Sequence, residues 1–185
     1  MKTAICTLAA VSPYSQSRAH ETPKNDRETA DAFETRTWRE KCHVTPGGNI
    51  FIPPMAFKQA IDAAAKMLGM QIPGKGKATY TKYFLSGVLC TEGRVLPETK
   101  ETVGEDRVYC NADGIRGSGK RVWRRFPRIE SWRGDLPVAI LANEITREVF
   151  EETLRQAGNF VGIGRFRPQS GGFYGRFAVE RIRWQ

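Results

Sequence analysis

The chain has 185 residues, of which 40% are hydrophobic and 10% aromatic, so it can form a folded core and wholesale disorder is excluded. Lys and Arg number 29 against 20 Asp and Glu, giving a formal net charge of +9. A charge of this size predicts an anionic partner. The candidates are a nucleic acid, an anionic membrane surface and an acidic protein. The length is typical of a single domain, residues 1–185.

A membrane is the weakest of these partners. The uncharged stretch 3–17 contains Thr7, Ser12 and Pro13 and is too short and too polar to span a bilayer. Four scattered cysteines show no paired spacing, which indicates neither a disulfide framework nor a zinc site (Cys6, Cys42, Cys90 and Cys110). We therefore expect a cytoplasmic protein with reduced thiols, no metal and no cofactor.

The first half of the chain contains one clear strand and one clear helix. Residues 2–11 are predicted as a strand. Residues 13–50 form a polar, turn-rich insertion with a short helix over 31–37, a strand-like stretch over 37–44, and a tight turn into a strand at 50. The helix over 54–68 follows the i, i+3, i+4 spacing of apolar residues, begins at a proline and ends at a glycine.

The second half alternates loops and strands around a second helix. A second insertion over about 70–120 comprises a lysine-glycine loop with aromatic residues, two short strands over 88–112 and a loop over 113–120. Strands are then expected in RVWRRFPRI and LPVAILA, a helix over 145–157 with a glycine cap at 158, and a final strand over 173–184. The order predicts an α+β, ferredoxin-like (RRM-like) βαββαβ core with long insertions, a topology shared with RNA-recognition domains.

Basic and aromatic residues are interleaved between Arg116 and Arg133, where seven cations alternate with Trp123, Phe126 and Trp132. Arginines contact phosphates and exposed aromatics stack on unpaired bases, so the mixture favours a single-strand binder. The alternative is a strand pair with solvated arginines and core aromatics. The same mixture recurs over 75–83 and 165–176.

The segment from Gly114 to Lys120 matches the G-x-x-x-x-G-K pattern of a phosphate-binding loop. Arg121 replaces the Ser or Thr that would hold magnesium, and the following residues suit a strand, not the required helix. A nucleotide triphosphatase is therefore disfavoured, and a flexible basic loop explains the same residues.

Catalytic candidates are few, because His20 and His43 are the only histidines and neither lies in a nucleophile or metal motif. A metal-free ribonuclease could use His20 beside Tyr14 and Arg18. Asp26 and Asp31 could assist cleavage, but aspartates in such loops are usually turn residues, and both histidines are more simply ordinary side chains.

Three segments in order resemble the RAMP superfamily of CRISPR-associated proteins, especially the backbone subunit that binds guide RNA. VSPYSQS (11–17) is similar to the family's turn after the first strand. FIPPMAFKQAIDAAA (51–65) resembles its entry into the first helix, and GIGRFRPQSGGFYGRFAVERI resembles its glycine-rich loop before the last strand.

The resemblance implies a non-catalytic binder of single-stranded RNA that forms a head-to-tail filament with copies of itself and other CRISPR subunits, the two insertions serving as finger and thumb. Alternatives are a guide-processing endoribonuclease of the same fold, and a phage-encoded protein that binds single-stranded DNA or mimics a subunit. The basic stretches and the resemblance together give these predicted nucleic-acid-binding residues: Ser12, Tyr14, Ser15, Gln16, Ser17, Arg18, Lys58, Lys75, Lys77, Arg116, Lys120, Arg121, Arg165, Phe166, Arg167, Gln169 and Ser170.

Overall fold

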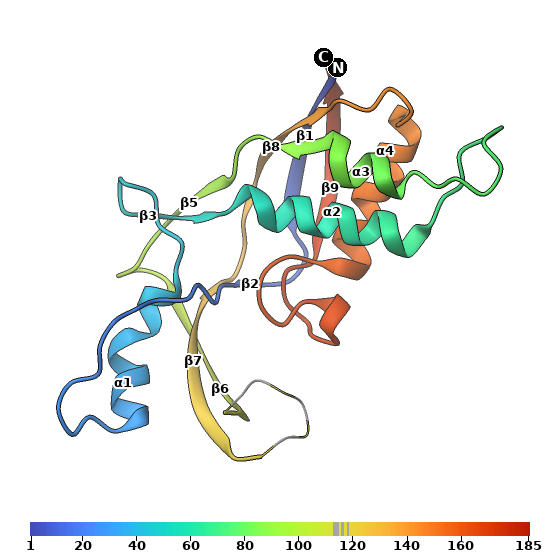
Figure 1. Ribbon diagram of the computed structural model, residues 1–185. Coiled ribbons are helices and arrows are strands. Elements are labelled where there is room, and N and C mark those ends of the chain that lie inside the picture. The colour runs from blue at the N-terminus through green and yellow to red at the C-terminus, as the bar shows by residue number, and fades with distance from the viewer. Residues whose placement is uncertain (113–114, 116, 118) are drawn as a thin grey trace.

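The computed structural model describes residues 1–112, 115, 117 and 119–185 (Figure 1). Its strands are β1 (Lys2–Ala10), β2 (Tyr14–Ser15), β3 (Asn49–Ile52), β4 (Val88–Cys90), β5 (Arg94–Thr99), β6 (Gly104–Asn111), β7 (Arg121–Ile129), β8 (Arg133–Ile140) and β9 (Phe177–Trp184). Its helices are α1 (Ala30–Thr37), α2 (Pro54–Leu68), α3 (Thr81–Gly87) and α4 (Arg147–Gln156), with short turns η1 (Trp38–Lys41), η2 (Ala157–Val161) and η3 (Pro168–Ser170). The class is therefore α+β, as predicted.

The largest sheet has four antiparallel strands in the order β4-β8-β1-β9. Cys6 in β1 lies opposite Leu136 in β8 on one side and Ile182 in β9 on the other. Along the chain, α2 lies between β1 and β4, and α4 lies between β8 and β9. This arrangement is compatible with the ferredoxin-like fold predicted from the sequence.

The core lies between this sheet and its helices. Alternate residues of β1, namely Ala4, Cys6 and Leu8, are fully buried, as the two-residue period of a strand requires. They join one buried cluster with Phe57 of α2 and Phe150 of α4. Among the described residues, no helix has the length and apolar content needed to cross a bilayer.

A second, smaller part of the molecule extends away from this core and is drawn at the bottom of Figure 1. It contains α1 and the long antiparallel ribbon of β6 and β7, to which the two residues of β2 add a third strand. Strands β3 and β5 form a separate pair between the two parts. The first predicted insertion supplies α1, η1 and β2, and the second supplies β5 and β6.

Helix α2 confirms the prediction over 54–68. Pro54 occupies the first turn, where its missing N–H costs nothing, and Gly69 ends the helix with a φ of 54°. Helix α4 begins later than predicted, at Arg147, with the Thr146 hydroxyl accepting a hydrogen bond from the Val149 amide. Gly158 does not cap α4 but lies inside the π-helical turn η2, where a side chain would collide with the Phe177 carbonyl.

The strand predicted over 37–44 is wrong. Thr37 ends α1 and residues 38–41 form a 3₁₀ turn, followed only by an isolated bridge at Val44. The buried residues Glu34, Trp38 and Lys41 are spaced four and three apart, a helical period that the apparent alternation concealed.

Two further differences fall in the range 70–120. Residues 81–87 form α3 instead of a loop, and residues 88–112 contain three strands instead of two. The first of these, β4, pairs with β8 in the four-stranded sheet, so that part of the range belongs to the sheet. The final strand begins at Phe177 and not at 173, because the glycine-rich turn continues through Gly175.

Candidate nucleic-acid interface

A hollow of about 370 Å³ lies at the first turn of α2. Three segments that are far apart in the sequence meet there, and they are the three that carry the RAMP resemblance. The lining residues are Tyr14, Gln16 and Ser17 after β1; Pro53, Met55, Ala56 and Gln59 at α2; Gly164, Arg165 and Arg167 before β9; and His43.

A second hollow of about 500 Å³ continues along α2 and shares Gln59 with the first. We call the two together the α2 groove. The second hollow is lined by Gln59, Asp62, Ala63, Lys66, Met67, Leu85 and Gln169. Two adjoining open hollows lined by cations and uncharged polar groups suit a single strand.

The loop after β1 is held by its own buried polar side chains. The Ser15 hydroxyl donates to the Pro127 carbonyl at 2.8 Å, and the Ser12 hydroxyl accepts from the Arg176 amide at 3.0 Å. The Gln16 side chain donates to the Phe51 carbonyl and accepts from the His43 amide. Of the residues predicted to bind nucleic acid in this loop, only Ser17 and Arg18 have exposed side chains. Tyr14 is buried, and this burial raises the pKa of its hydroxyl.

Glycines allow the loop before β9 to lie against the loop after β1. Gly164 has a φ of 76°, and a Cβ there would lie 2.4 Å from the Ser15 carbonyl oxygen. The Arg165 amide donates to that same oxygen at 2.9 Å, and the Gly175 amide donates to the Pro13 carbonyl at 2.7 Å. The two loops therefore form one wall of the groove.

Arg165 lines the groove but is largely engaged inside the protein. Its Nε donates to the Ser15 hydroxyl, and its guanidinium forms an ion pair with Asp106. The guanidinium also lies 3.9 Å from the centroid of the Phe126 ring. Burial lowers the pKa of Arg165, and the Asp106 charge opposes that effect. Arg165 thus joins the groove to the β6–β7 ribbon.

Arg167 is the cation best placed to meet a ligand in the groove. Its Nε is buried and has no hydrogen-bond partner among the described residues. Arg167 also forms no ion pair with any of them. The side chain is half-buried and lines the first hollow, so an anionic ligand there would meet a guanidinium that no described acid neutralises. Arg18 and Lys66 are exposed near the two ends of the groove and likewise form no ion pair with a described residue.

Lys58, predicted to contact a phosphate, points into the protein. Its ammonium forms an ion pair with Asp62 and donates to the carbonyls of Phe84 and Leu85. These bonds attach α3 to α2. Burial raises the pKa of Asp62, against the effect of the Lys58 charge.

The remaining predicted residues are distributed over the surface. Gln169 lines the second hollow, and Phe166 and Ser170 are exposed on the same loop. Lys75 and Lys77 are exposed on the loop before α3, while Lys120 and Arg121 are exposed at the end of the β6–β7 ribbon. Arg116 and Gly114 lie outside the described residues. β7 follows Lys120, so the strand predicted in place of a nucleotide-binding helix is confirmed.

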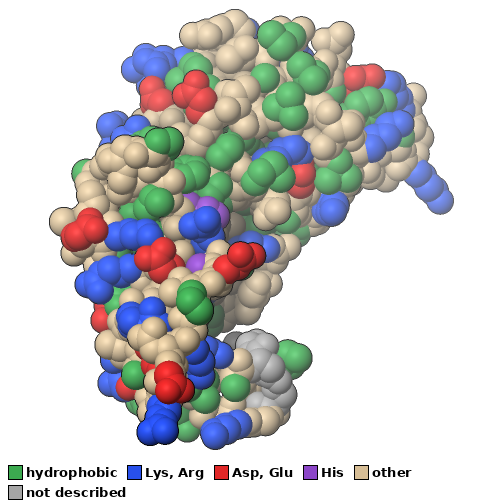
Figure 2. Space-filling view, turned by 60° about the vertical axis from the view of Figure 1, so that its left-hand side comes forward, with side chains coloured by type: hydrophobic (Ala, Val, Ile, Leu, Met, Phe, Trp, Pro, Cys, Tyr) green, Lys and Arg blue, Asp and Glu red, His purple; other side chains and the backbone are tan. Residues whose placement is uncertain are grey.

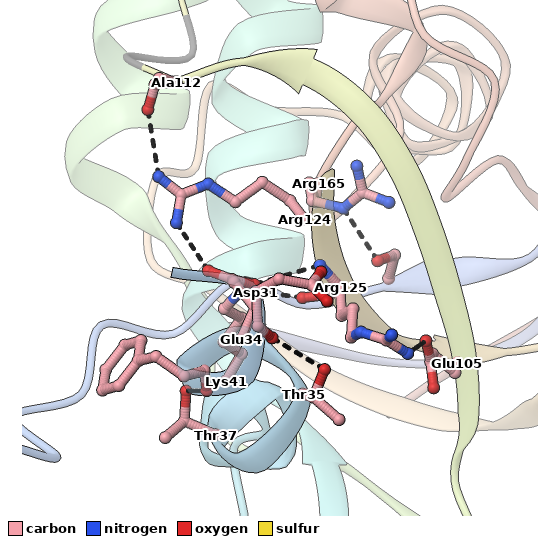
Figure 3. Close-up of polar contacts among 12 residues, drawn as sticks. Asp31, Glu34, Thr35, Thr37, Lys41, Glu105, Ala112, Arg124, Arg125 and Arg165 are labelled. Atoms are coloured by element: carbon pink, nitrogen blue, oxygen red, sulfur yellow. Dashed lines mark hydrogen bonds and ion pairs between the residues drawn. The ribbon is translucent and has the colours of Figure 1, made fainter. Parts of the chain in front are cut away.

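The ribbon is attached to α1 by a buried carboxylate (Figure 3). Glu34 accepts hydrogen bonds from the Lys41 ammonium, the Arg124 guanidinium and the Arg125 amide. Burial alone would raise the pKa of Glu34, but these donors outweigh it and hold the pKa below its usual value. Lys41 also lies 4.3 Å from the Phe126 ring, on which Arg165 stacks as well.

Of the two histidines, the groove contains His43 and not His20. His20 lies in the loop before α1, where its ring forms a hydrogen bond with the Thr22 hydroxyl at 3.1 Å and stacks on Phe33 of α1. His43 lines the first hollow, and burial, with the nearby Arg18 charge, lowers its pKa. Asp26 and Asp31 line neither hollow.

Several groove residues are absent from the predicted set, among them His43, Met55, Gln59 and Lys66. Gln59 lies one turn after Met55 on the polar side of α2, a signal that was available from the helical period. His43 carried no such signal, because its segment was assigned to a strand. The described residues contain no cluster of His, Cys, Asp and Glu that could hold a metal ion.

Charge is concentrated unevenly over the surface. Figure 2 shows Lys and Arg gathered on the lower half of the visible face, at the height of α1, β6 and β7 in Figure 1, with Asp and Glu among them. Histidine side chains lie near the middle of this face. On this face the basic side chains therefore lie among acidic ones and do not form a uniformly positive surface.

No family model matches the chain, and no curated protein matches its sequence. The solved structures to which it is similar include Cmr6 from Pyrococcus furiosus, with a TM-score of 0.49 and 13% identity over 97% of this chain and 99% of that one. They also include a CRISPR RNA-guided surveillance complex, with a TM-score of 0.41 and 8% identity over 98% of this chain and 68% of that one. Similarity at this level does not extend to a function.

Proposed function

We propose that the chain binds single-stranded RNA in the α2 groove, as a non-catalytic component of a CRISPR-type ribonucleoprotein. The strand would pass the first turn of α2 and continue along the helix toward Lys66. Recognition would be mainly of backbone and shape, through Arg167 in the groove and the exposed Arg18 beside it.

The observation that carries the proposal is the convergence of three sequence segments on one groove that contains an unpartnered cation. The segments after β1, at α2 and before β9 were singled out from the sequence independently of their positions in space. Arg167 lies among them with a buried Nε that lacks an acceptor. A phosphate oxygen of a bound strand would neutralise the half-buried Arg167 guanidinium, which no described acid neutralises.

The order β1, α2, β4, β8, α4, β9 supports the finer assignment of a βαββαβ core. The strand order β4-β8-β1-β9 corresponds to that of a ferredoxin-like sheet. In this assignment, residues 13–50 and the parts of 70–120 outside β4 are the additions that extend the binding surface. Head-to-tail contact between copies of the chain belongs to the same proposal.

Binding is tested by fluorescence anisotropy with a labelled 20-nucleotide RNA, the DNA of the same sequence and the RNA duplex. Arg167→Ala should weaken single-strand binding about tenfold, as loss of a charge-assisted contact implies. Arg183→Ala is the matched control, because that arginine pairs with Asp135 and lines neither hollow. Equal binding by Arg167→Ala and the native chain would exclude the α2 groove as the site.

A second candidate, metal-free RNA cleavage, is favoured by one observation. His43 lies in the groove with a lowered pKa, so it is neutral near pH 7 and could accept the proton of a ribose 2′-hydroxyl. Incubation of end-labelled RNA with the native chain and His43→Ala distinguishes the two. Products that form with the native chain and disappear in the variant would establish the enzyme; intact RNA in both agrees with the binder.

A further inference from the structure

Tyr109 of β6 and Trp123 of β7 lie directly opposite each other in the β6–β7 ribbon. Their ring centroids are 5.1 Å apart. The Arg107 guanidinium lies 4.4 Å from the Trp123 ring, and the Arg121 guanidinium lies 4.7 Å from the Tyr109 ring. We call these four residues the β6–β7 ladder.

The ladder is exposed. Tyr109 is 47% exposed and Trp123 46%, whereas Trp38 and Trp132 are almost completely buried. Two large aromatic side chains that remain half in water on neighbouring strands form an apolar patch bounded by cations. Such patches mark surfaces that bind a ligand or partner.

The opposite face of the ribbon explains why the ladder cannot turn inward. Asp106 and Phe126 pair across the strands three register positions from Tyr109 and Trp123, and both are held by Arg165. Because side chains alternate between the two faces of a strand, docking Asp106 and Phe126 onto the protein leaves Tyr109 and Trp123 on the other face. The ladder is thus an outward-facing surface on a ribbon whose orientation is fixed.

A cross-strand aromatic pair also stabilises a ribbon, and that role alone would account for the contact between Tyr109 and Trp123. It does not account for the two arginines, which no acid among the described residues approaches more closely than 4.0 Å. Within that part of the chain, the Arg121 side chain donates a hydrogen bond only to the Tyr109 carbonyl, and Arg107 forms one long ion pair, with Asp31 at 4.0 Å. Exposed rings flanked by guanidinium groups are the combination that holds stacked bases and their phosphates.

We propose that the β6–β7 ladder is a second binding site, separate from the α2 groove, on which unpaired bases of a single-stranded nucleic acid stack. The ligand class rests on the proposed function, but the site does not share residues with the groove. Trp123 and Tyr109 supply the stacking surface. Arg107 and Arg121 hold the adjoining phosphates.

The test compares two strands of equal length and charge, one with bases and one in which abasic sites replace them. The variants are Trp123→Ala, Trp123→Phe, Arg167→Ala and the control Phe160→Ala, which removes a similarly exposed ring outside both hollows. Trp123→Ala should lose about tenfold in affinity for the strand with bases and little for the abasic strand. Trp123→Phe should retain most of the affinity, and Phe160→Ala all of it.

The fluorescence of Trp123 gives a second readout, since a stacked base quenches an exposed indole. Quenching by the strand with bases, absent in Trp123→Phe, supports the ladder. Unchanged affinity in Trp123→Ala, or an equal loss on both strands, overturns it. If Arg167→Ala weakens both strands while Trp123→Ala weakens neither, the groove stands and the ladder falls. If the native chain binds neither strand, the proposed function fails as well.

Discussion

The guanidinium of Arg165, in the loop before β9, forms an ion pair with the carboxylate of Asp106 in β6. Both side chains are largely buried, and the pair joins the wall of the α2 groove to the β6–β7 ribbon. Together with the pairing of β2 and β7, this contact and the Phe126 ring beside it set the position of the ribbon relative to the groove.

Asp106→Asn should destabilise the protein by about 3 kcal/mol, because it leaves the buried Arg165 charge without a counter-ion. Glu180→Gln is the control, since its ion pair with Arg133 is exposed and should be worth less than about 1 kcal/mol. Urea denaturation followed by circular dichroism measures both. Equal midpoints for the two variants would show that the Arg165 contact does not hold the ribbon.

Glu34→Gln should cost a similar amount, about 3 kcal/mol, because Lys41 and Arg124 both lose their buried partner. Since the folded-state pKa of Glu34 is lowered, its stabilisation is present above the unfolded-state pKa and is lost as the pH falls through the folded-state pKa. Denaturation of the native chain and the variant between pH 7 and pH 3 should therefore converge at the acidic end. A constant difference across that range would contradict this role.

Gly164→Ala and Gly74→Ala separate backbone conformation from close packing. Both glycines have a φ of 76°, but a Cβ at Gly164 would meet Ser15 and Tyr14, whereas one at Gly74 meets no atom within 4 Å. We expect a loss of about 1 kcal/mol for Gly74→Ala and about 3 kcal/mol for Gly164→Ala, measured by thermal unfolding. Equal losses of stability in the two variants would mean that the loop before β9 can move away from the loop after β1 at no cost in free energy.

His43 should make the stability depend on pH in the mildly acidic range. Because burial lowers its folded-state pKa below the usual 6.5, its protonation favours the unfolded chain, and stability falls as the pH drops below about 6.5. His43→Gln should lack this part of the decrease, while His20→Gln should retain it. If the stability of the native chain and of His43→Gln fell in parallel as the pH drops, the His43 imidazole would have the same pKa in the folded and unfolded states, which contradicts its burial.

Periodicity predicted the elements that form the core, because the sequence there obeys a local rule. The apolar residues of β1 and α2 repeat with the periods of a strand and a helix, and Gly69 marks the end of α2. The segment over 37–44 was assigned wrongly because Trp38 and Lys41 are buried by contacts with distant partners. Lys41, for example, donates to the Arg125 carbonyl in β7.

The site was predicted in part. Its three segments were identified from their residue types, and the structure brings them together in one groove. The roles of individual cations could not be predicted, because they depend on contacts across the fold. Lys58 and Arg165 have the same sequence signature as Arg167, yet Asp62 and Asp106 neutralise the first two and no described acid neutralises the third.

The salt dependence of single-stranded RNA binding tests the central claim most directly. Affinity measured between 50 and 300 mM salt should fall steeply on a double-logarithmic plot, with a slope of about −0.7 for each phosphate contacted. Arg167→Ala should reduce the slope by about one such contact, and Arg183→Ala should leave it unchanged. Undetectable binding at low salt, or an affinity that does not change with salt, would contradict the assignment of this chain as a binder of single-stranded RNA.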